Sequence, residues 1–248
     1  GTAVTTGVQN TFVGAEAGDA TTTGGYSTAV GKDALGANTT GGHNVAVGRL
    51  ALKSNTTANN NVAVGNETLN ANTTGTSNTA VGHAALLANT TADNNTAVGF
   101  YALKGNTTGS NNTAVGYGSG DSVTTGAQNT FVGNHCGGAT DDGAYNTAMG
   151  YAALFSNSGD NNTAYGSQAL YSTTGINNTS CGYAAGYSVT SGSNNLVLGT
   201  DAGRSGSPGG LITTHSNQLA LGDENITSAS VQVDWTVASD ARDKTDFT

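Results

Sequence analysis

Side chains able to do chemistry are sparse in this chain, and their spacing does not assemble a catalytic or metal-binding set. Cys136 and Cys181 are too few for the disulfide framework of a small secreted domain, so we expect both to be small core residues. The histidines lack the pairing that metal sites use. They occupy four non-equivalent positions: His43, His83, His135 and His215. We therefore expect no metal ion or other cofactor.

Acidic side chains are isolated in the same way. A calcium-binding β-roll needs an aspartate in every turn, whereas Asp141, Asp142 and Asp160 stand alone in predicted loops. A glycoside hydrolase needs two neighbouring carboxyl groups, and no such pair emerges from the sequence. We expect no enzymatic activity toward an external substrate, and a polysaccharide depolymerase is kept as the less favoured alternative.

The end of the chain has the densest charge and the only tryptophan. The stretch from Val231 to Val237 alternates apolar and polar side chains and predicts one further β-strand around Trp235. Ser239 and Asp240 follow this stretch, and both residue types are favoured at the start of a helix or turn. We therefore treat residues 223–238 as a terminal β segment and residues 239–248 as the start of another unit.

The amino-acid composition limits the class of fold that the rest of the chain can have. The chain has 248 residues, of which 35% are hydrophobic and 9% charged, against nearly half and about a quarter in a typical globular domain. No apolar run reaches the roughly 18 residues that span a bilayer, so no membrane insertion is expected. A net charge of -9 argues against nucleic acid, which needs clustered lysines and arginines. A repetitive β protein with a thin core of small side chains remains.

A short phrase related to Asn-Thr-Ala-Val-Gly recurs thirteen times, mostly at the constant interval of seventeen that separates Gly65 from Gly82. Its glycines are Gly14, Gly31, Gly48, Gly65, Gly82, Gly99, Gly116, Gly133, Gly150, Gly166, Gly182, Gly199 and Gly222. Such a period predicts a parallel β-solenoid or β-roll over residues 1–222, because each coil buries its apolar side chains against its neighbours. Thirteen coils would form a rod about 60 Å long. Gly1 lies in a repeat-like stretch, so we expect the sequence to begin within a longer protein.

Each repeat unit is expected to contain two short strands and two bends. Residues 78–82 predict the first strand, residues 85–86 a second apolar segment, and residues 72–75 a β-turn that begins with asparagine and ends with glycine. Both alternating positions of the strand avoid charge. One of them should fill the interior of the coil, and the other could pack against a neighbouring chain.

Stacking places equivalent residues of successive coils in columns. The strand-opening asparagines are expected to hydrogen-bond along the rod, with contact to a glycan as the alternative. They are Asn44, Asn61, Asn78, Asn95, Asn112, Asn129 and Asn146. Asn38 and Asn72 begin Asn-x-Thr sequons, which we interpret as repeated turns and not as glycosylation sites. The Thr-Thr columns raise the possibility of ice binding, although their location in turns disfavours it.

The hexapeptide Ser239-Asp240-Ala241-Arg242-Asp243-Lys244 resembles the Ser-Asp-x-Arg-x-Lys sequence that opens the self-cleaving intramolecular chaperone domain of phage tail spikes and fibres. The resemblance implies Ser239 as the nucleophile and Lys244 as its base, provided that the lysine pKa is lowered. That family's domain is far longer than residues 239–248. The segment is therefore expected to be a truncated start that does not cleave itself.

The repeats themselves resemble the heads of trimeric autotransporter adhesins, with the closest phrases at residues 44–48 and 61–65. That resemblance covers residues 10 to about 222 and implies left-handed parallel β-rolls packed as a homotrimer. The repeat unit of this chain is longer than the unit of that family, which leaves the cross-section of the coil open.

Together the two resemblances predict a structural and adhesive homotrimer, the shaft or receptor-binding part of a phage tail fibre located in the virion tail. Its partners would be a host-surface glycan or protein receptor and other tail or baseplate proteins. A bacterial trimeric surface adhesin is the alternative. Aromatic side chains near the turns are the candidates for receptor contact: Tyr101, Tyr117, Tyr151 and Tyr183.

Overall fold

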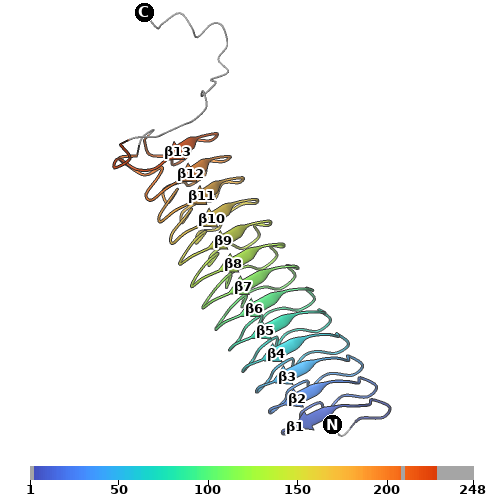
Figure 1. The fold of residues 1–248 in the computed structure, drawn as a ribbon. Helices are drawn as coiled ribbons and strands as arrows, with labels where there is room; N and C mark the ends of the chain where they lie inside the picture. The colour runs from blue at the N-terminus through green and yellow to red at the C-terminus, as the bar shows by residue number, and fades with distance from the viewer. Residues whose placement is uncertain (1–2, 208–209, 228–248) are drawn as a thin grey trace, which may run out of the picture.

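A computed structural model of the chain describes residues 3–207 and 210–227 and shows a rod of stacked coils (Figure 1). Thirteen strands of three residues each form one parallel sheet in chain order. The strands are β1 (Thr11–Val13), β2 (Thr28–Val30), β3 (Val45–Val47), β4 (Val62–Val64), β5 (Thr79–Val81), β6 (Thr96–Val98), β7 (Thr113–Val115), β8 (Thr130–Val132), β9 (Thr147–Met149), β10 (Thr163–Tyr165), β11 (Thr179–Cys181), β12 (Leu196–Leu198) and β13 (Leu219–Leu221). Helices are absent from the described residues, so none there could cross a membrane.

The repeat period equals the register of the sheet. Thr79 pairs with Thr96, and Thr96 pairs with Thr113, so one repeat period returns the chain to the same position one coil further. The longest step between strands keeps the register as well, because Leu196 pairs with Leu219. These pairings confirm the predicted all-β solenoid. The left-handedness of the coil and its packing as a trimer stay predictions.

The second strand predicted for each coil is wrong. The Ala-Leu segment instead forms a turn, in which Leu86 has a left-handed φ of 51°. Its N–H donates to the carbonyl of Ala102 in the next coil at 3.0 Å, so the segment stacks without becoming extended. A left-handed residue costs about 1–2 kcal/mol, yet it reverses the chain within a few residues. The coil closes on one strand of three residues for this reason.

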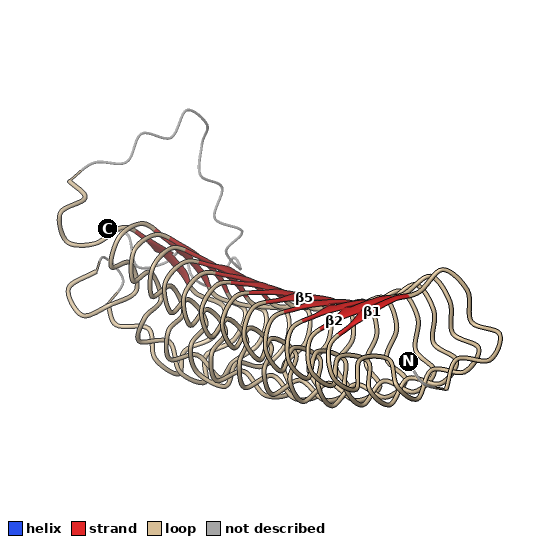
Figure 2. Ribbon diagram, turned by 90° about the horizontal axis from the view of Figure 1, so that it is seen from below, coloured by secondary structure: helices blue, strands red, loops and turns tan. Residues whose placement is uncertain are grey.

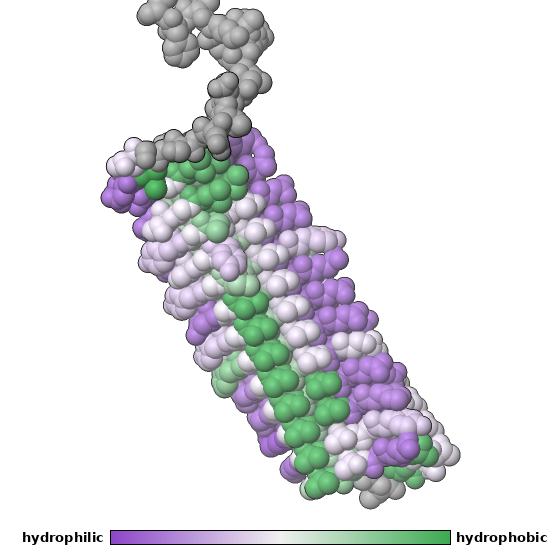
Figure 3. Space-filling model, in the orientation of Figure 1, coloured by the Kyte–Doolittle hydropathy of each residue, from purple (hydrophilic) through white to green (hydrophobic). Residues whose placement is uncertain are grey.

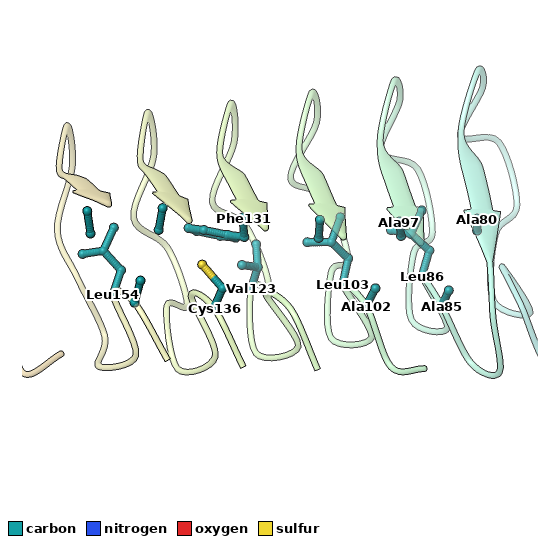
Figure 4. Packing of buried hydrophobic residues seen from close by; sticks show 14 of the residues in the cluster. Ala80, Ala85, Leu86, Ala97, Ala102, Leu103, Val123, Phe131, Cys136 and Leu154 are labelled. Atoms are coloured by element: carbon teal, nitrogen blue, oxygen red, sulfur yellow. The ribbon is translucent and has the colours of Figure 1, made fainter. Parts of the chain in front are cut away.

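The interior of the coil is filled by the central strand residue and by the Ala-Leu segment (Figure 4). Ala97 from β6 and the side chains of Ala102 and Leu103 are all fully buried. Val98, the next residue of β6, points outward and is 37% exposed. The structure therefore settles which strand position fills the core: alanine faces inward and valine faces outward.

The strand-opening asparagines are buried and tie each coil to the next. Asn112 Oδ1 accepts the backbone N–H of Asn129 at 2.9 Å, and Asn112 Nδ2 donates to the carbonyl oxygen of Gly126 at 2.8 Å. The backbone N–H of Asn112 in turn donates to Asn95 Oδ1 at 2.8 Å. The structural interpretation is thus confirmed, while glycan contact through this buried column is wrong.

The asparagines that open the turns form a second buried column. Asn72 Nδ2 donates to Asn55 Oδ1 at 3.1 Å and also to the carbonyl oxygen of Gly75 within its own turn. Asn72 is fully buried, so its sequon is inaccessible in the folded rod. The threonine that follows is also used structurally, because Thr73 Oγ1 donates to the carbonyl oxygen of Thr90 at 3.0 Å. These turn columns hold the coils together, while the second threonine of each pair, such as Thr74 and Thr91, stays exposed.

Replacement of Asn112 by leucine should destabilise the rod by about 2–6 kcal/mol, because it leaves the N–H of Asn129 and the carbonyl of Gly126 buried without partners. Denaturant unfolding would measure the loss. The matched control is Asn111→Leu, since Asn111 is exposed and has a left-handed φ of 62° that Leu50 also adopts, at 60°. Equal stability of the two variants would contradict a structural role for this column.

Candidate receptor and assembly surfaces

The residues predicted for self-cleavage, Ser239 and Lys244, lie outside the described residues. The same holds for all of the predicted chaperone start at residues 239–248 and for residues 228–238 of the predicted terminal β segment. The surfaces that can be built from the structure are therefore those of the rod itself.

The two cysteines have different environments. Cys136 is buried beside Phe131 and Val123 (Figure 4), and burial raises the pKa of its thiol to about 12, so it is unreactive. Cys181, by contrast, is exposed at the third position of β11, where side chains point out of the coil. The predicted core location is confirmed for Cys136 and wrong for Cys181. No group of three possible metal ligands occurs in the described part of the chain.

Two carboxyl groups do meet across the repeats, contrary to the sequence prediction. Glu16 and Asp33 occupy equivalent positions of the first two coils, and a hydrogen bond between them raises the pKa of Glu16 and lowers that of Asp33. Lys32 Nζ also lies 3.2 Å from Asp33 Oδ2. Glu16 lies two residues after Gly14, and Asp33 lies two residues after Gly31. This shared position in the repeat is the sequence signal that could have identified the pair. Glu16 is exposed, unlike the raised-pKa general acid of a glycosidase, which is held in an apolar pocket.

The outer side of the sheet forms a surface that we call the strand face. It consists of the first and third residues of every strand, and none of them is charged. The third residues form an apolar stripe that runs along most of the rod and is interrupted in its C-terminal half (Figure 3). They are Val13, Val30, Val47, Val64, Val81, Val98, Val115, Val132, Met149, Tyr165, Cys181, Leu198 and Leu221. The stripe is exposed: Val64 and Val98, for example, are 36% and 37% exposed.

Seven aromatic rings in successive coils form a continuous chain of contacts. They are His83, Phe100, Tyr117, His135, Phe155, Tyr171 and Tyr187. The rings of Phe100 and Tyr117 stack with centroids 5.4 Å apart, and those of Tyr171 and Tyr187 stack at 4.9 Å. The guanidinium of Arg204 lies over the last ring, 5.1 Å from its centroid. Stacked pairs such as Phe100 with Tyr117 cover each other's faces, while His135 meets Tyr117 and Phe155 edge-on, and both kinds of contact stabilise the stacking of coils.

The four predicted receptor tyrosines fall into two groups. Tyr117 is a member of the aromatic chain, 5.4 Å from Phe100, and Tyr101 packs beside that chain, with its ring 4.1 Å from the ring of Phe100. Tyr151 and Tyr183 contact no other ring of the described residues and are 56% and 53% exposed. Sequence reasoning missed Tyr165, which is 57% exposed in the coil between them. Its signal was the replacement of valine by tyrosine at the third strand position.

The chain is nearly free of charge around these tyrosines. Between Asp142 and Asp201, the only charged residue is Asp160. Its carboxylate accepts the backbone N–H of Ala144 at 2.9 Å. The lower coils differ, since they contain ion pairs such as Arg49 with Glu67 at 2.9 Å. The surface of the rod thus changes from charged at its N-terminal end to uncharged and aromatic in the coils of β9 to β11.

Comparison with known proteins adds no relative. No protein-family model matches the chain, and no curated protein matches it either. The function is therefore argued from the strand face, from the exposed tyrosines and from the two short sequence resemblances.

Proposed function

We propose that this chain is the shaft of a structural and adhesive homotrimeric fibre, and that the strand face is the contact between copies. The observation that carries the proposal is the uncharged strand face along all thirteen strands, whose third residues are apolar without a break from β1 to β9. A contiguous exposed apolar patch of several hundred Å² marks an interaction surface in a soluble protein. A strand face about 60 Å long and on the order of 10 Å wide offers about 600 Å² per chain, close to one side of a standard interface.

A second copy of the same chain fits this surface better than a different partner. The uninterrupted part of the stripe extends from β1 to β9, so only a long rod would cover it, and an identical rod has the same spacing between coils. Net charge also favours this face. Each chain carries a formal charge of -9, and the strand face is the side on which copies can approach without bringing charges together.

The number of copies and the biological setting come from the sequence resemblances. Both families that the chain resembles form trimers, and the hexapeptide at residues 239–244 resembles the start of a phage fibre chaperone. We therefore favour a phage tail fibre in the virion tail, with other tail proteins and a host-surface receptor as partners. A bacterial surface adhesin would use the same rod and the same interface.

Light scattering of the purified rod should give three times the chain mass of 24.4 kDa. The double variant Val64→Glu, Val98→Glu should shift it to monomer, because it places charges in the stripe that would be buried between copies. The matched control is Thr74→Glu, which introduces the same charge at an exposed turn residue. A monomeric wild-type rod, or a variant that remains fully trimeric, would sink the proposed interface.

Cross-linking tests the arrangement of the copies. In a Cys181→Ser background, Val98→Cys should form a disulfide between chains when oxygen and copper oxidise the two thiols, because parallel copies in register bring equivalent residues together. Thr74→Cys should not cross-link, since it lies in a turn and outside the strand face. Efficient cross-linking at Thr74→Cys alone would place the contact elsewhere on the rod.

Ice binding is the second candidate, because the structure places threonines in a regular outward column on the strand face as well as in the turns. Thr79, Thr96 and Thr113 are first residues of successive strands on the strand face. Figure 2 counts against this candidate, since the row of strands follows a curve along the rod instead of a plane. A monomer that inhibits ice recrystallisation would favour it over the fibre.

A further inference from the structure

We propose that Tyr151, Tyr165 and Tyr183 form a binding site for a neutral hexose polymer, which we call the tyrosine platform. This inference deepens the adhesive role proposed above and rests on it for its biological meaning. It names a location, the coils of β9 to β11, and a ligand chemistry, an uncharged polyhydroxyl ring.

The repeat places the three tyrosines in three successive coils. Tyr151 follows Gly150 and Tyr183 follows Gly182, so the two tyrosines occupy the same column two coils apart, at a backbone separation of about 10 Å. The coil between them has the small Ser167 in that column. Tyr165, the last residue of β10, lies in this middle coil. The serine thus leaves room between the two larger side chains for a ligand ring.

Exposed ring faces distinguish the tyrosine platform from the chain of seven rings. A sugar ring stacks on the flat face of an aromatic side chain, and each ring in the chain of seven is already in contact with a neighbouring ring, at 4.9–6.4 Å between centroids. Each of the three platform tyrosines is more than half exposed and contacts no ring of the described residues. They are the exposed tyrosines that occur in three successive coils, whereas the equally exposed Tyr145 lies before β9, at the opposite end of that strand from Tyr151.

Charge selects the class of sugar. Acidic sugars need lysine or arginine partners, and no basic residue occurs between Asp142 and Asp201. The polar groups near the tyrosine platform are uncharged hydroxyls and amides, including Thr163, Ser167 and Gln168. Hydroxyl and amide groups match the hydroxyls of a neutral hexose.

The same tyrosines interrupt the contact proposed between copies. Tyr165 occupies the third strand position, where β1 to β8 all have valine. If valine side chains set the distance between two rods, a tyrosine at the same position is too large for that distance, since tightly packed contacts tolerate little added volume. Rods in contact along the valines would have to separate at β10, which leaves the tyrosine platform open to a ligand.

Affinity electrophoresis in native gels containing dextran, mannan or galactan tests the site. The full chain should be retarded by at least one of these neutral polymers and not by polygalacturonate. Tyr151→Ala and Tyr183→Ala should each raise the dissociation constant obtained from the retardation about tenfold, which is equivalent to about 1.4 kcal/mol of binding free energy. The matched control is Tyr145→Ala, since Tyr145 is 58% exposed but lies before β9, at the opposite end of that strand from Tyr151.

Each result decides the matter. Retardation that is lost in the Tyr151 and Tyr183 variants but kept in the control supports the site. Absence of retardation by all three neutral polymers, preference for polygalacturonate, or equal binding by all variants overturns it. Light scattering of the same samples separates this outcome from the fibre: a trimer without retardation overturns only the site, whereas a monomer with tyrosine-dependent retardation overturns only the assembly.

Discussion

Replacement of Gly65 by alanine should cost the rod more than about 4 kcal/mol of stability, a loss that only a few mechanisms cause. Gly65 has a φ of 140°, in a region that residues with a Cβ scarcely enter. An added Cβ would lie 2.5 Å from the carbonyl oxygen of Gly82 in the next coil. Both atoms are fixed by the sheet, so the clash cannot be relieved by rotation of a side chain. Thermal and denaturant unfolding would measure the effect.

Gly118→Ala is the control for this prediction. Gly118 has a φ of 56°, close to the value at which Tyr101 and His135 occur at the same position of neighbouring coils. A Cβ there would meet the ring of His135, which can move, instead of backbone. The loss should be about 1–2 kcal/mol, the normal cost of a left-handed residue with a Cβ. If both variants lost the same stability, close approach of the coils at Gly65 would not be the cause.

Phe131→Ala and Gly137→Leu should each be strongly destabilising, while the double variant should recover most of the loss. The usual coil combines an inward alanine with an inward leucine, as in Ala97 and Leu103, whereas this coil combines phenylalanine with glycine. A Cβ on Gly137 would lie 2.7 Å from the ring of Phe131, so the ring occupies the place of the leucine. Removing the ring alone leaves a cavity and should lower the free energy of unfolding by about 3–5 kcal/mol. Adding leucine alone overfills the coil.

The double-mutant cycle is what makes the second prediction specific. The backbone already suits leucine, because Gly137 has a φ of 63° and seven leucines at this position of other coils have values between 48° and 52°. We therefore expect a favourable coupling of several kcal/mol, beyond the usual range for neighbours of about 0.5–3 kcal/mol. As a control, Phe131→Ala combined with Leu35→Ala should be additive, since Leu35 lies six coils away. Additivity of the Phe131 and Gly137 changes would refute this account of the core.

Phe12 supports the same interpretation at the other end of the rod. It too is a phenylalanine at the central strand position, and its coil has Gly18 where others have leucine. A Cβ on Gly18 would lie 2.6 Å from the Phe12 ring. The exchange is visible in the sequence as two nearby departures within one repeat, but its meaning needs the structure, because only the closed coil shows that the two positions share one space.

Much of the fold was determined by the sequence alone, for a simple physical reason. A strict repeat forces every coil into the same conformation, so the spacing of the glycines sets the register of the sheet and the number of strands. Low charge follows from the same repetition, since like charges in a column would repel one another. The all-β solenoid could be predicted because these features are local and recur thirteen times.

Tertiary structure decided what local patterns left open. In a strand of three uncharged residues, periodicity could not say whether Ala97 or Val98 faces inward, because both are apolar; closure of a narrow coil selects the smaller one. The left-handed turn at Leu86 was equally hidden, since leucine has no intrinsic preference for it, and only stacking between coils holds it there. The three platform tyrosines lie in three separate repeats and are far apart along the chain. They become neighbours only because coils stack, and that is why the candidate site belongs to the structure and not to the sequence.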